Sequence, residues 1–260
     1  MVATGICGKN LVRLSPTVES PDTLAITPIG HIESPFREKF GTPRQAGLVP
    51  AAAGTIILHE EYRRIEMWRG LTDFSHVWLL WGFHLVPNPV AGSPGKSTVR
   101  PPRLGGNDRL GVFATRSPFR PNRIGLSCVK LTAVDAGKGT IDVSGIDLVN
   151  DTPIFDIKPY VPYADIKLDA TSSFAPDGDL RLGSHAITYS EQAAAVTKNN
   201  PTFIDMLEQT LRADPRPAYH ETDDRPYGLA LQEYNVRFLV HEDHIHVIGI
   251  EPRSCSPAAH

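Results

Sequence analysis

The hydrophobic pattern of this chain is that of many short strands rather than of a helical protein. Short apolar runs alternate with turns rich in Gly, Pro, Asn and Ser, and no strand-helix-strand rhythm is visible. Such a pattern is typical of antiparallel barrels and sandwiches. The sequence therefore predicts a mainly β protein whose residues 24–166 form an antiparallel β-barrel. The predicted strands lie within residues 24–35, 54–58, 75–84, 111–115, 126–134 and 140–149, with one helical stretch at residues 60–68.

The pattern changes in the second half of the chain. Hydrophobic content falls over residues 167–186, which indicates a linker between domains. Residues 187–260 then predict a small α+β domain, whereas residues 1–23 predict a poorly ordered N-terminal extension. Pro201 suits the first position of a helix, and the apolar residues after it recur at helical spacing. The expected elements are a helix at 191–198, a helix with the stripe Phe203, Ile204, Leu207 and Leu211, and strands at 229–240 and 245–250 around a turn at 241–244.

Composition limits the cellular setting and the class of protein. Of the 260 residues, 41% are hydrophobic, which is enough for a substantial core. The three cysteines, Cys7, Cys128 and Cys255, have no C-x-x-C spacing, so we expect neither a disulfide framework nor a zinc site. The most apolar window, residues 76–86, is far shorter than the roughly 20 residues of a membrane helix. A cytoplasmic protein without membrane spans is the resulting prediction.

Positive charge is concentrated in one segment, Arg100–Gly125. This segment has a single acidic residue, Asp108, although the whole chain has a formal net charge of -3. Guanidinium groups suit bidentate contacts with phosphates or carboxylates, and the prolines between them restrict the backbone. The segment therefore favours an anionic partner such as RNA over a merely solvated loop. Its arginines are Arg100, Arg103, Arg109, Arg116, Arg120 and Arg123.

Several common functional motifs are missing from the sequence. There is no P-loop, no G-x-G-x-x-G between a strand and a helix, and no G-x-S-x-G elbow, which disfavours a nucleotide-binding or serine hydrolase site of those types. His241, His244 and His246 are the best metal candidates, because the last two would project from one strand face. A solvated hairpin tip remains the favoured interpretation of these histidines, so no metal site is predicted.

Two loops have the composition of ligand-binding segments. Residues 41–48 and residues 150–154 place polar groups and exposed backbone next to predicted strand ends, where ligands commonly bind. Ordinary turn chemistry is the alternative explanation for both.

Taken together, the motifs resemble the TrmO (TsaA/YaeB-like) family. The resemblance runs in order along the chain and covers nearly everything after residue 25. The motifs that carry it are Pro-Ile-Gly-His-Ile-Glu-Ser-Pro-Phe (28–36), Pro-Arg-Gln-Ala-Gly-Leu (43–48), Phe-Ser-His-Val-Trp (74–78), Arg-Pro-Pro-Arg-Leu-Gly-Gly-Asn (100–107), Gly-Val-Phe-Ala-Thr-Arg-Ser-Pro-Phe-Arg-Pro-Asn-Arg-Ile-Gly (111–125), Asp-Leu-Val-Asn-Asp-Thr-Pro-Ile-Phe-Asp-Ile-Lys-Pro-Tyr (147–160), Asp-Pro-Arg-Pro-Ala-Tyr (214–219) and Tyr-Asn-Val-Arg (234–237).

The resemblance implies a function and a partner. Members of this family are non-Rossmann, β-barrel methyltransferases that use S-adenosyl-L-methionine and act on the adenosine beside the tRNA anticodon. The modified base is N6-threonylcarbamoyladenosine, which gains a methyl group on N6, and the family is described as homodimeric. The sequence departs from the family pattern at Asn150-Asp151, where many members have Asp-Gly, and at Arg123-Ile124, where they have a proline-containing step.

The same resemblance implies a cofactor site. Arg116 suits the methionine carboxylate of the cofactor, and the backbone groups of the loops suit its adenine and ribose. The implied cofactor-binding residues are Gln45, Ala46, Gly47, His84, Leu85, Arg116, Leu126, Asp151, Thr152, Pro153 and Ile154.

A second set of residues is expected to face the anticodon loop of the tRNA. An exposed aromatic such as Phe119 suits stacking on an unpaired base. The predicted RNA-binding residues are Arg44, Arg103, Phe119, Arg120, Asn122, Arg123 and Lys158. The general base is not identified by the sequence, and Asp151, Asp156 and Tyr160 remain open as candidates. The alternative function is a non-catalytic module that binds tRNA or another anion through the same arginines.

Overall fold

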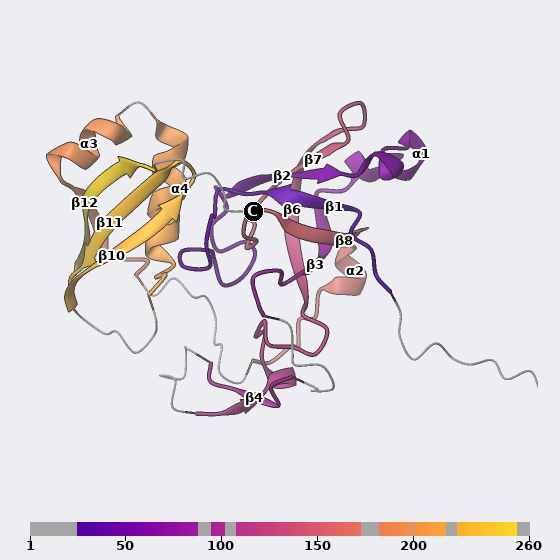
Figure 1. Cartoon of the computed structure of the whole chain (residues 1–260), viewed down its shortest axis with the longest axis horizontal. Coiled ribbons are helices and arrows are strands. Elements are labelled where there is room, and N and C mark those ends of the chain that lie inside the picture. Colours follow the sequence, from indigo (N-terminus) through magenta and orange to yellow (C-terminus); the bar gives the residue numbers. More distant parts are fainter. Residues whose placement is uncertain are drawn as a thin grey trace, which may run out of the picture.

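The computed structural model describes most of the chain as two lobes joined side by side (Figure 1). One lobe holds the β-barrel and the other holds a smaller sheet with its helices. Residues 1–23, predicted as an extension, lie outside the described part, as do the middle of the predicted linker and Arg103. The described residues are 25–87, 95–101, 108–172, 182–198, 200–216 and 223–253.

The first lobe is a closed barrel in the order β1-β2-β7-β6-β3-β8, and all of its strand pairs are antiparallel. The predicted antiparallel barrel is thereby confirmed. Its strands are β1 (Gly30–Glu33), β2 (Ala53–Leu58), β3 (His76–Gly82), β6 (Ile124–Asp135), β7 (Thr140–Ser144) and β8 (Thr152–Pro159). A separate two-stranded ribbon is formed by β4 (Thr98–Val99) and β5 (Leu110–Gly111).

The second lobe is a four-stranded sheet in the order β10-β11-β12-β9, with helices α3 and α4 beside it (Figure 1). Its elements are β9 (Ala186–Tyr189), α3 (Glu191–Thr197), α4 (Pro201–Arg212), β10 (Asp223–Leu231), β11 (Tyr234–Val240) and β12 (His244–Pro252). The parallel pairing of β9 with β12 is the exception in this otherwise antiparallel sheet. A small α+β domain was predicted here, and this lobe confirms it.

Local sequence explains how the two longer helices begin. The Asn200 side chain accepts a hydrogen bond from the backbone of Phe203 at 3.1 Å, and the Ser190 side chain accepts one from Ala193 at 3.2 Å. Each bond satisfies a donor that has no partner within the helix. The remaining helical turns are short, and they are η1 (Glu60–Tyr62), α1 (Ile65–Trp68), η2 (Leu71–Asp73), η4 (Val112–Ala114) and α2 (Pro162–Asp165).

Alternation along the strands builds the core of each lobe. In β3, for example, Val77, Leu79 and Trp81 are buried while the residues between them are less so, because successive side chains point to opposite faces of a strand. The helix α4 buries Phe203, Leu207 and Leu211 of the predicted stripe, together with Met206 and Thr210.

Three element predictions were wrong, each for a local reason. Residues 111–115 form the end of β5 and the 3-10 turn η4 instead of a strand. The predicted strand 229–240 is two strands, because Gln232 adopts a left-handed φ of 51° and turns the chain between β10 and β11. The strand predicted at 140–149 ends at Ser144, and the next residue, Gly145, has a φ of 73° that only glycine adopts readily.

A close approach of β6 to β3 gives a test of the barrel packing. A Cβ atom added at Gly125 would lie 2.3 Å from the indole ring of Trp81, its partner in β3. We expect Gly125→Ala to destabilise the protein by about 2 kcal/mol, because a rigid ring must shift inside the wall of a packed barrel. Gly228→Ala in β10 is the matched control, since a Cβ there meets nothing within 4 Å. Urea unfolding measures both, and equal midpoints would contradict the prediction.

Candidate functional site

The predicted cofactor loop, Gln45–Gly47, lies between β1 and β2 and is fixed against the barrel. The backbone N–H of Gly47 donates to the carbonyl of Gly145 at 2.8 Å, and Gly47 has a left-handed φ of 84°. The Arg116 guanidinium, which follows the turn η4, donates to the Gln45 side-chain oxygen. The structure thus brings together predicted site residues that are 71 positions apart in the sequence.

A half-buried carboxylate, Asp147, lies directly behind this loop. Asp147 accepts hydrogen bonds from the Ser127 hydroxyl at 2.6 Å and from the backbone N–H of Ala46. Ser127 in turn accepts from the Trp81 indole N–H at 2.9 Å. Burial raises the pKa of Asp147 to about 6, although these hydrogen bonds and the charge of Arg116 act in the opposite direction. The carboxylate therefore ties the wall of the barrel to the loop.

A second group of predicted residues gathers at the end of β3. His84 Nδ1 lies 3.4 Å from the Thr152 hydroxyl, whose proton is donated to the carbonyl of Val149 at 2.6 Å. Burial lowers the pKa of His84, against the raising effect of the Asp151 charge. The imidazole is consequently neutral near pH 7, and it offers one ring nitrogen as a hydrogen-bond acceptor.

The neighbouring backbone is held by two cations. Lys39 Nζ donates to the carbonyl of Leu85 at 2.6 Å, and Arg123 Nη1 donates to the carbonyl of Val86 at 2.8 Å. Hydrogen bonds to charged groups are the stronger ones in proteins. The predicted segment His84–Leu85 is therefore anchored on its carbonyl side by residues from two other parts of the chain.

The remaining predicted cofactor residues differ in what they expose. Leu126 on β6 is 57% exposed and Leu85 is 43% exposed, so both present apolar surface. Ile154 is fully buried in the barrel core, and Thr152 is 1% exposed. Together with Pro153 these two residues pair with β1. A ligand can thus contact the segment 151–154 mainly at its N-terminal residue, Asp151.

Asp151 occupies a position where many members of the family that the sequence resembles have glycine. Its φ of 63° is left-handed, a conformation that aspartate tolerates better than most residues. The side chain accepts from the Asn150 amide at 2.8 Å. Asp151 also lines a polar groove of about 860 Å³ with residues of β1, β2 and β7 and with Gln232 and Glu233 of the second lobe.

The three candidate bases are far from equivalent in position. The charge of Asp151 acts on His84, where it partly opposes the lowering of the His84 pKa by burial. Asp156 sits in the middle of β8, where its carboxylate accepts from the backbone of Ile157 at 2.9 Å. Tyr160 follows the other end of β8 and packs near Trp78, with ring centroids 5.9 Å apart. The structure does not bring Tyr160 to the cofactor loop, whereas it places Asp151 beside the second group.

The arginines of the basic segment have distinct surroundings. Arg116 contacts Gln45, whereas Arg120 donates to the carbonyls of Val112 and Thr115 at 3.3 and 2.6 Å and so closes the turn η4. Phe119 is 40% exposed and carries Lys96 Nζ at 4.1 Å over its ring. At least one predicted RNA-binding residue, Arg120, therefore also stabilises the conformation of a loop.

The other predicted RNA contacts are spread over the molecule. Asn122 is exposed beside Arg123. Lys158 on β8 is also exposed, with Asp156 at 3.9 Å. Arg44 is half-buried and donates to the carbonyl of Arg216 in the second lobe at 2.6 Å. Arg103 lies outside the described residues.

Sequence reasoning missed several residues that belong to this region. Asp147 and Ser127 have the local sequence context of ordinary strand or turn residues, and nothing local shows that the fold brings them into hydrogen-bond contact. Phe113, 77% exposed with Arg120 5.9 Å from its ring, was hidden by the expectation of a strand at residues 111–115. An aromatic beside several arginines was the signal that could have identified it.

Two absences concern only the described part of the chain. There, no group of three or more His, Cys, Asp or Glu side chains is arranged to hold a metal ion. His241 and His244 stack at 4.4 Å between ring centroids, and His244 contacts Asp243 at 2.7 Å. Among these same residues, no helix has the length and apolar character to cross a membrane.

Comparison with known families gives two adjacent matches. Residues 31–166, which contain the barrel, match the tRNA-methyltransferase O N-terminal domain. Residues 184–253, which contain the second sheet, match the TrmO C-terminal domain.

Individual relatives agree with these matches. The chain is 41% identical to the tRNA (adenine(37)-N6)-methyltransferase of Escherichia coli (strain K12), over 86% of this chain and 97% of that relative. It is 44% identical to a putative S-adenosylmethionine-dependent methyltransferase, RcsF, of Pseudomonas aeruginosa, over 83% of this chain and 92% of that relative. A crystal structure of TrmO from P. aeruginosa superposes with a TM-score of 0.71 at 37% identity, covering 89% of this chain and 98% of that one.

The raised pKa of Asp147 predicts how the stability of the protein depends on pH. The pKa of Asp147 is about 6 in the folded protein and near 3.8 in an unfolded chain, so the folded state binds the proton more tightly. Its contribution to stability is full below about pH 4 and is lost as the pH rises through about 6. Relative to Asp147→Asn, the wild type should therefore lose about 2 kcal/mol of unfolding free energy between about pH 4.5 and 7.5. Urea unfolding at both pH values measures this difference, and parallel pH profiles would refute it.

Proposed function

This chain belongs to the tRNA-methyltransferase O family, and we propose that it transfers a methyl group from S-adenosyl-L-methionine to N6 of adenosine 37 in tRNA. The observation that carries the proposal is the match of both lobes, in order, to the two domains of that family. The geometry supports it, since residues from distant parts of the sequence converge beside one loop.

The residues present fit S-adenosyl-L-methionine. We assign Arg116 to the methionine carboxylate, because a guanidinium pairs well with that group. Leu85 and Leu126, which are exposed apolar side chains, suit the adenine ring. The proposed binding residues remain Gln45, Ala46, Gly47, His84, Leu85, Arg116, Leu126, Asp151, Thr152, Pro153 and Ile154. When bound, this cofactor supplies an activated methyl group on a sulfonium.

Positioning supplies most of what the protein adds to the reaction. Holding the nucleophile in line with the methyl group removes the entropy cost of bringing the two together. The N6 proton must also leave, and we assign its acceptance to Asp151, because the charge of this carboxylate acts on His84 at the proposed site. The neutral imidazole of His84 avoids placing another positive charge near the sulfonium.

Finer features of the proposal come from the family resemblance. We propose N6-threonylcarbamoyladenosine in the anticodon loop as the substrate base, with Phe119 or Phe113 available for stacking. We also propose a cytoplasmic homodimer, as well as domain limits of 24–166 and 187–260 with a linker at 167–186. Arg103, Arg120, Asn122, Arg123 and Lys158 are proposed RNA contacts.

A mass-spectrometric assay tests the function. The protein is incubated with S-adenosyl-L-methionine and tRNA that carries N6-threonylcarbamoyladenosine, and the digested nucleosides are analysed for one added methyl group. We expect the modified nucleoside to gain that group, whereas tRNA without the threonylcarbamoyl group serves as the control. Binding of tRNA without any methyl gain would favour the non-catalytic module.

The assignment of Arg116 gives a separate prediction. Arg116→Met keeps the aliphatic stem but removes the charge, so it should weaken S-adenosyl-L-methionine binding at least about tenfold, the loss of one charge-assisted contact. Titration calorimetry measures the dissociation constant. Arg109→Met is the matched control, because Arg109 lies in the same basic segment and, within the described part of the chain, donates only a long hydrogen bond, 3.5 Å, to the Thr98 hydroxyl. Equal losses in both variants would show that Arg116 acts only through general charge.

A further inference from the structure

The cofactor loop belongs to a longer segment without helix or strand, residues 35–51, that lies between the two lobes. One side of this segment contacts the barrel, as the bond from Gly47 to Gly145 shows. The other side contacts the second lobe through its backbone. These backbone contacts are Gln232 N to Pro35 O at 2.7 Å, a bridge between Phe36 and Leu231, and Ala51 N to the Gln209 side-chain oxygen at 2.9 Å.

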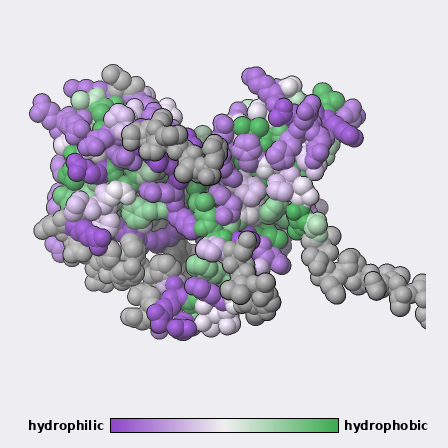
Figure 2. Space-filling view, viewed as in Figure 1, coloured by the Kyte–Doolittle hydropathy of each residue, from purple (hydrophilic) through white to green (hydrophobic). Residues whose placement is uncertain are grey.

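Side chains reinforce the same contact. The ring of Phe40 stacks with that of Tyr227 in β10, with centroids 6.5 Å apart and planes 7° apart. Gly41 has a φ of 89°, and a Cβ atom there would lie 1.8 Å from the Leu229 side chain. A side chain at position 41 would collide with β10, so only glycine allows the segment to pack this closely against that strand. Figure 2 shows hydrophobic residues where the two lobes meet.

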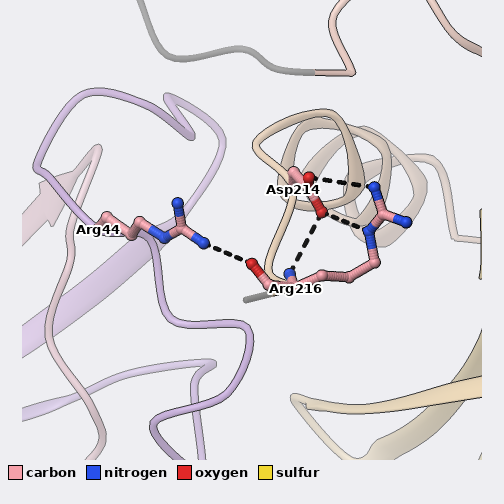
Figure 3. A network of polar contacts seen from close by, with 3 residues as sticks. All are labelled: Arg44, Asp214 and Arg216. Carbon is pink, nitrogen blue, oxygen red and sulfur yellow. Dashed lines mark hydrogen bonds and ion pairs between the residues drawn. The ribbon is translucent and has the colours of Figure 1, made fainter. Parts of the chain in front are cut away.

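A polar contact between the loop and the second lobe depends on a tight turn after α4. Asp214 has a left-handed φ of 48°, and its carboxylate binds the Arg216 guanidinium through Nε at 2.8 Å and Nη2 at 3.2 Å. Both side chains are nearly inaccessible, 1% and 3% exposed. The backbone N–H of Arg216 also donates to Asp214 at 3.3 Å. This ion pair fixes the conformation of the turn, and with it the direction of the Arg216 carbonyl (Figure 3).

Arg44 reaches across to that carbonyl. Its Nη2 donates to Arg216 O at 2.6 Å (Figure 3), and the next residue in the chain is Gln45, the first residue of the cofactor loop. The loop is thus tethered at Arg44 to the second lobe and at Gly47 to the barrel. A loop held in this way loses less conformational entropy when a ligand binds.

We propose that the second lobe is a positioning element for the cofactor loop, and that it acts through the hydrogen bond from Arg44 to the carbonyl of Arg216. The inference rests on the proposed function, because it concerns the binding of S-adenosyl-L-methionine. It assigns Arg44 to the contact between the lobes instead of to tRNA. It also assigns a role to the buried ion pair between Asp214 and Arg216, namely to orient the Arg216 carbonyl. Buried ion pairs do not reliably increase stability, so this role is an alternative reason for the pair.

Two variants of Arg44 test the inference. Arg44→Met keeps the stem and removes the donor, so the dissociation constant for S-adenosyl-L-methionine should rise about tenfold. Arg44→Lys retains a cationic donor and should recover much of the affinity. The dissociation constant for tRNA and its salt dependence should stay unchanged, because no phosphate contact is lost. Arg37→Met, an exposed arginine in the same segment, is the control and should leave cofactor binding unchanged.

The binding measurements on Arg44→Met have two outcomes that contradict the inference. An unchanged cofactor dissociation constant in Arg44→Met, or weaker tRNA binding with a shallower salt dependence, overturns the positioning role. If Arg44→Met does not fold, Arg44→Gln is measured in its place, because its shorter amide side chain also removes the guanidinium donor to the Arg216 carbonyl. Unaltered cofactor affinity in that variant would equally overturn the inference. A wild-type protein that binds no S-adenosyl-L-methionine would instead refute the proposed function itself.

Discussion

The structure depends most on how an irregular segment is held between two lobes. Residues 35–51 have no helix or strand to satisfy their own backbone groups, and buried backbone groups without partners are costly. Several of their partners come from elsewhere, namely Gly145 in the barrel and Gln232 and Gln209 in the second lobe. The conformation of the proposed cofactor loop therefore depends on the assembled molecule as well as on its local sequence.

The barrel contributes rigidity to the same site. Its closed, fully antiparallel sheet leaves no free edge, and the line of hydrogen bonds from Trp81 through Ser127 to Asp147 ends at the loop. Partial burial of this carboxylate is the main reason that its pKa is raised. Residues at functional sites often show such perturbed pKa values, and this one lies beside Arg116.

Cationic side chains in this protein serve two purposes. Lys39, Arg120 and Arg123 donate to backbone carbonyls of loops near the site, so they order the same surface that is proposed to meet an anionic RNA. A guanidinium has five donors, and one of them can hold a loop while others remain directed elsewhere. For this reason, the cationic residues of a positively charged segment do not all have to be phosphate contacts.

The sequence by itself determined the strand-rich barrel, the second α+β lobe and the family resemblance, and it pointed to Gln45, Arg116 and the residues around Asp151 as candidates for the site. These follow from hydrophobic alternation, turn residues and contiguous motifs, which are local signals. Only the tertiary structure decided that Asp147 lies half-buried behind the loop and binds Ser127, that Arg44 points to the second lobe, and that residues 111–115 form a turn. Burial and pairing between distant residues are set by how the whole chain packs, so no window of sequence contains them.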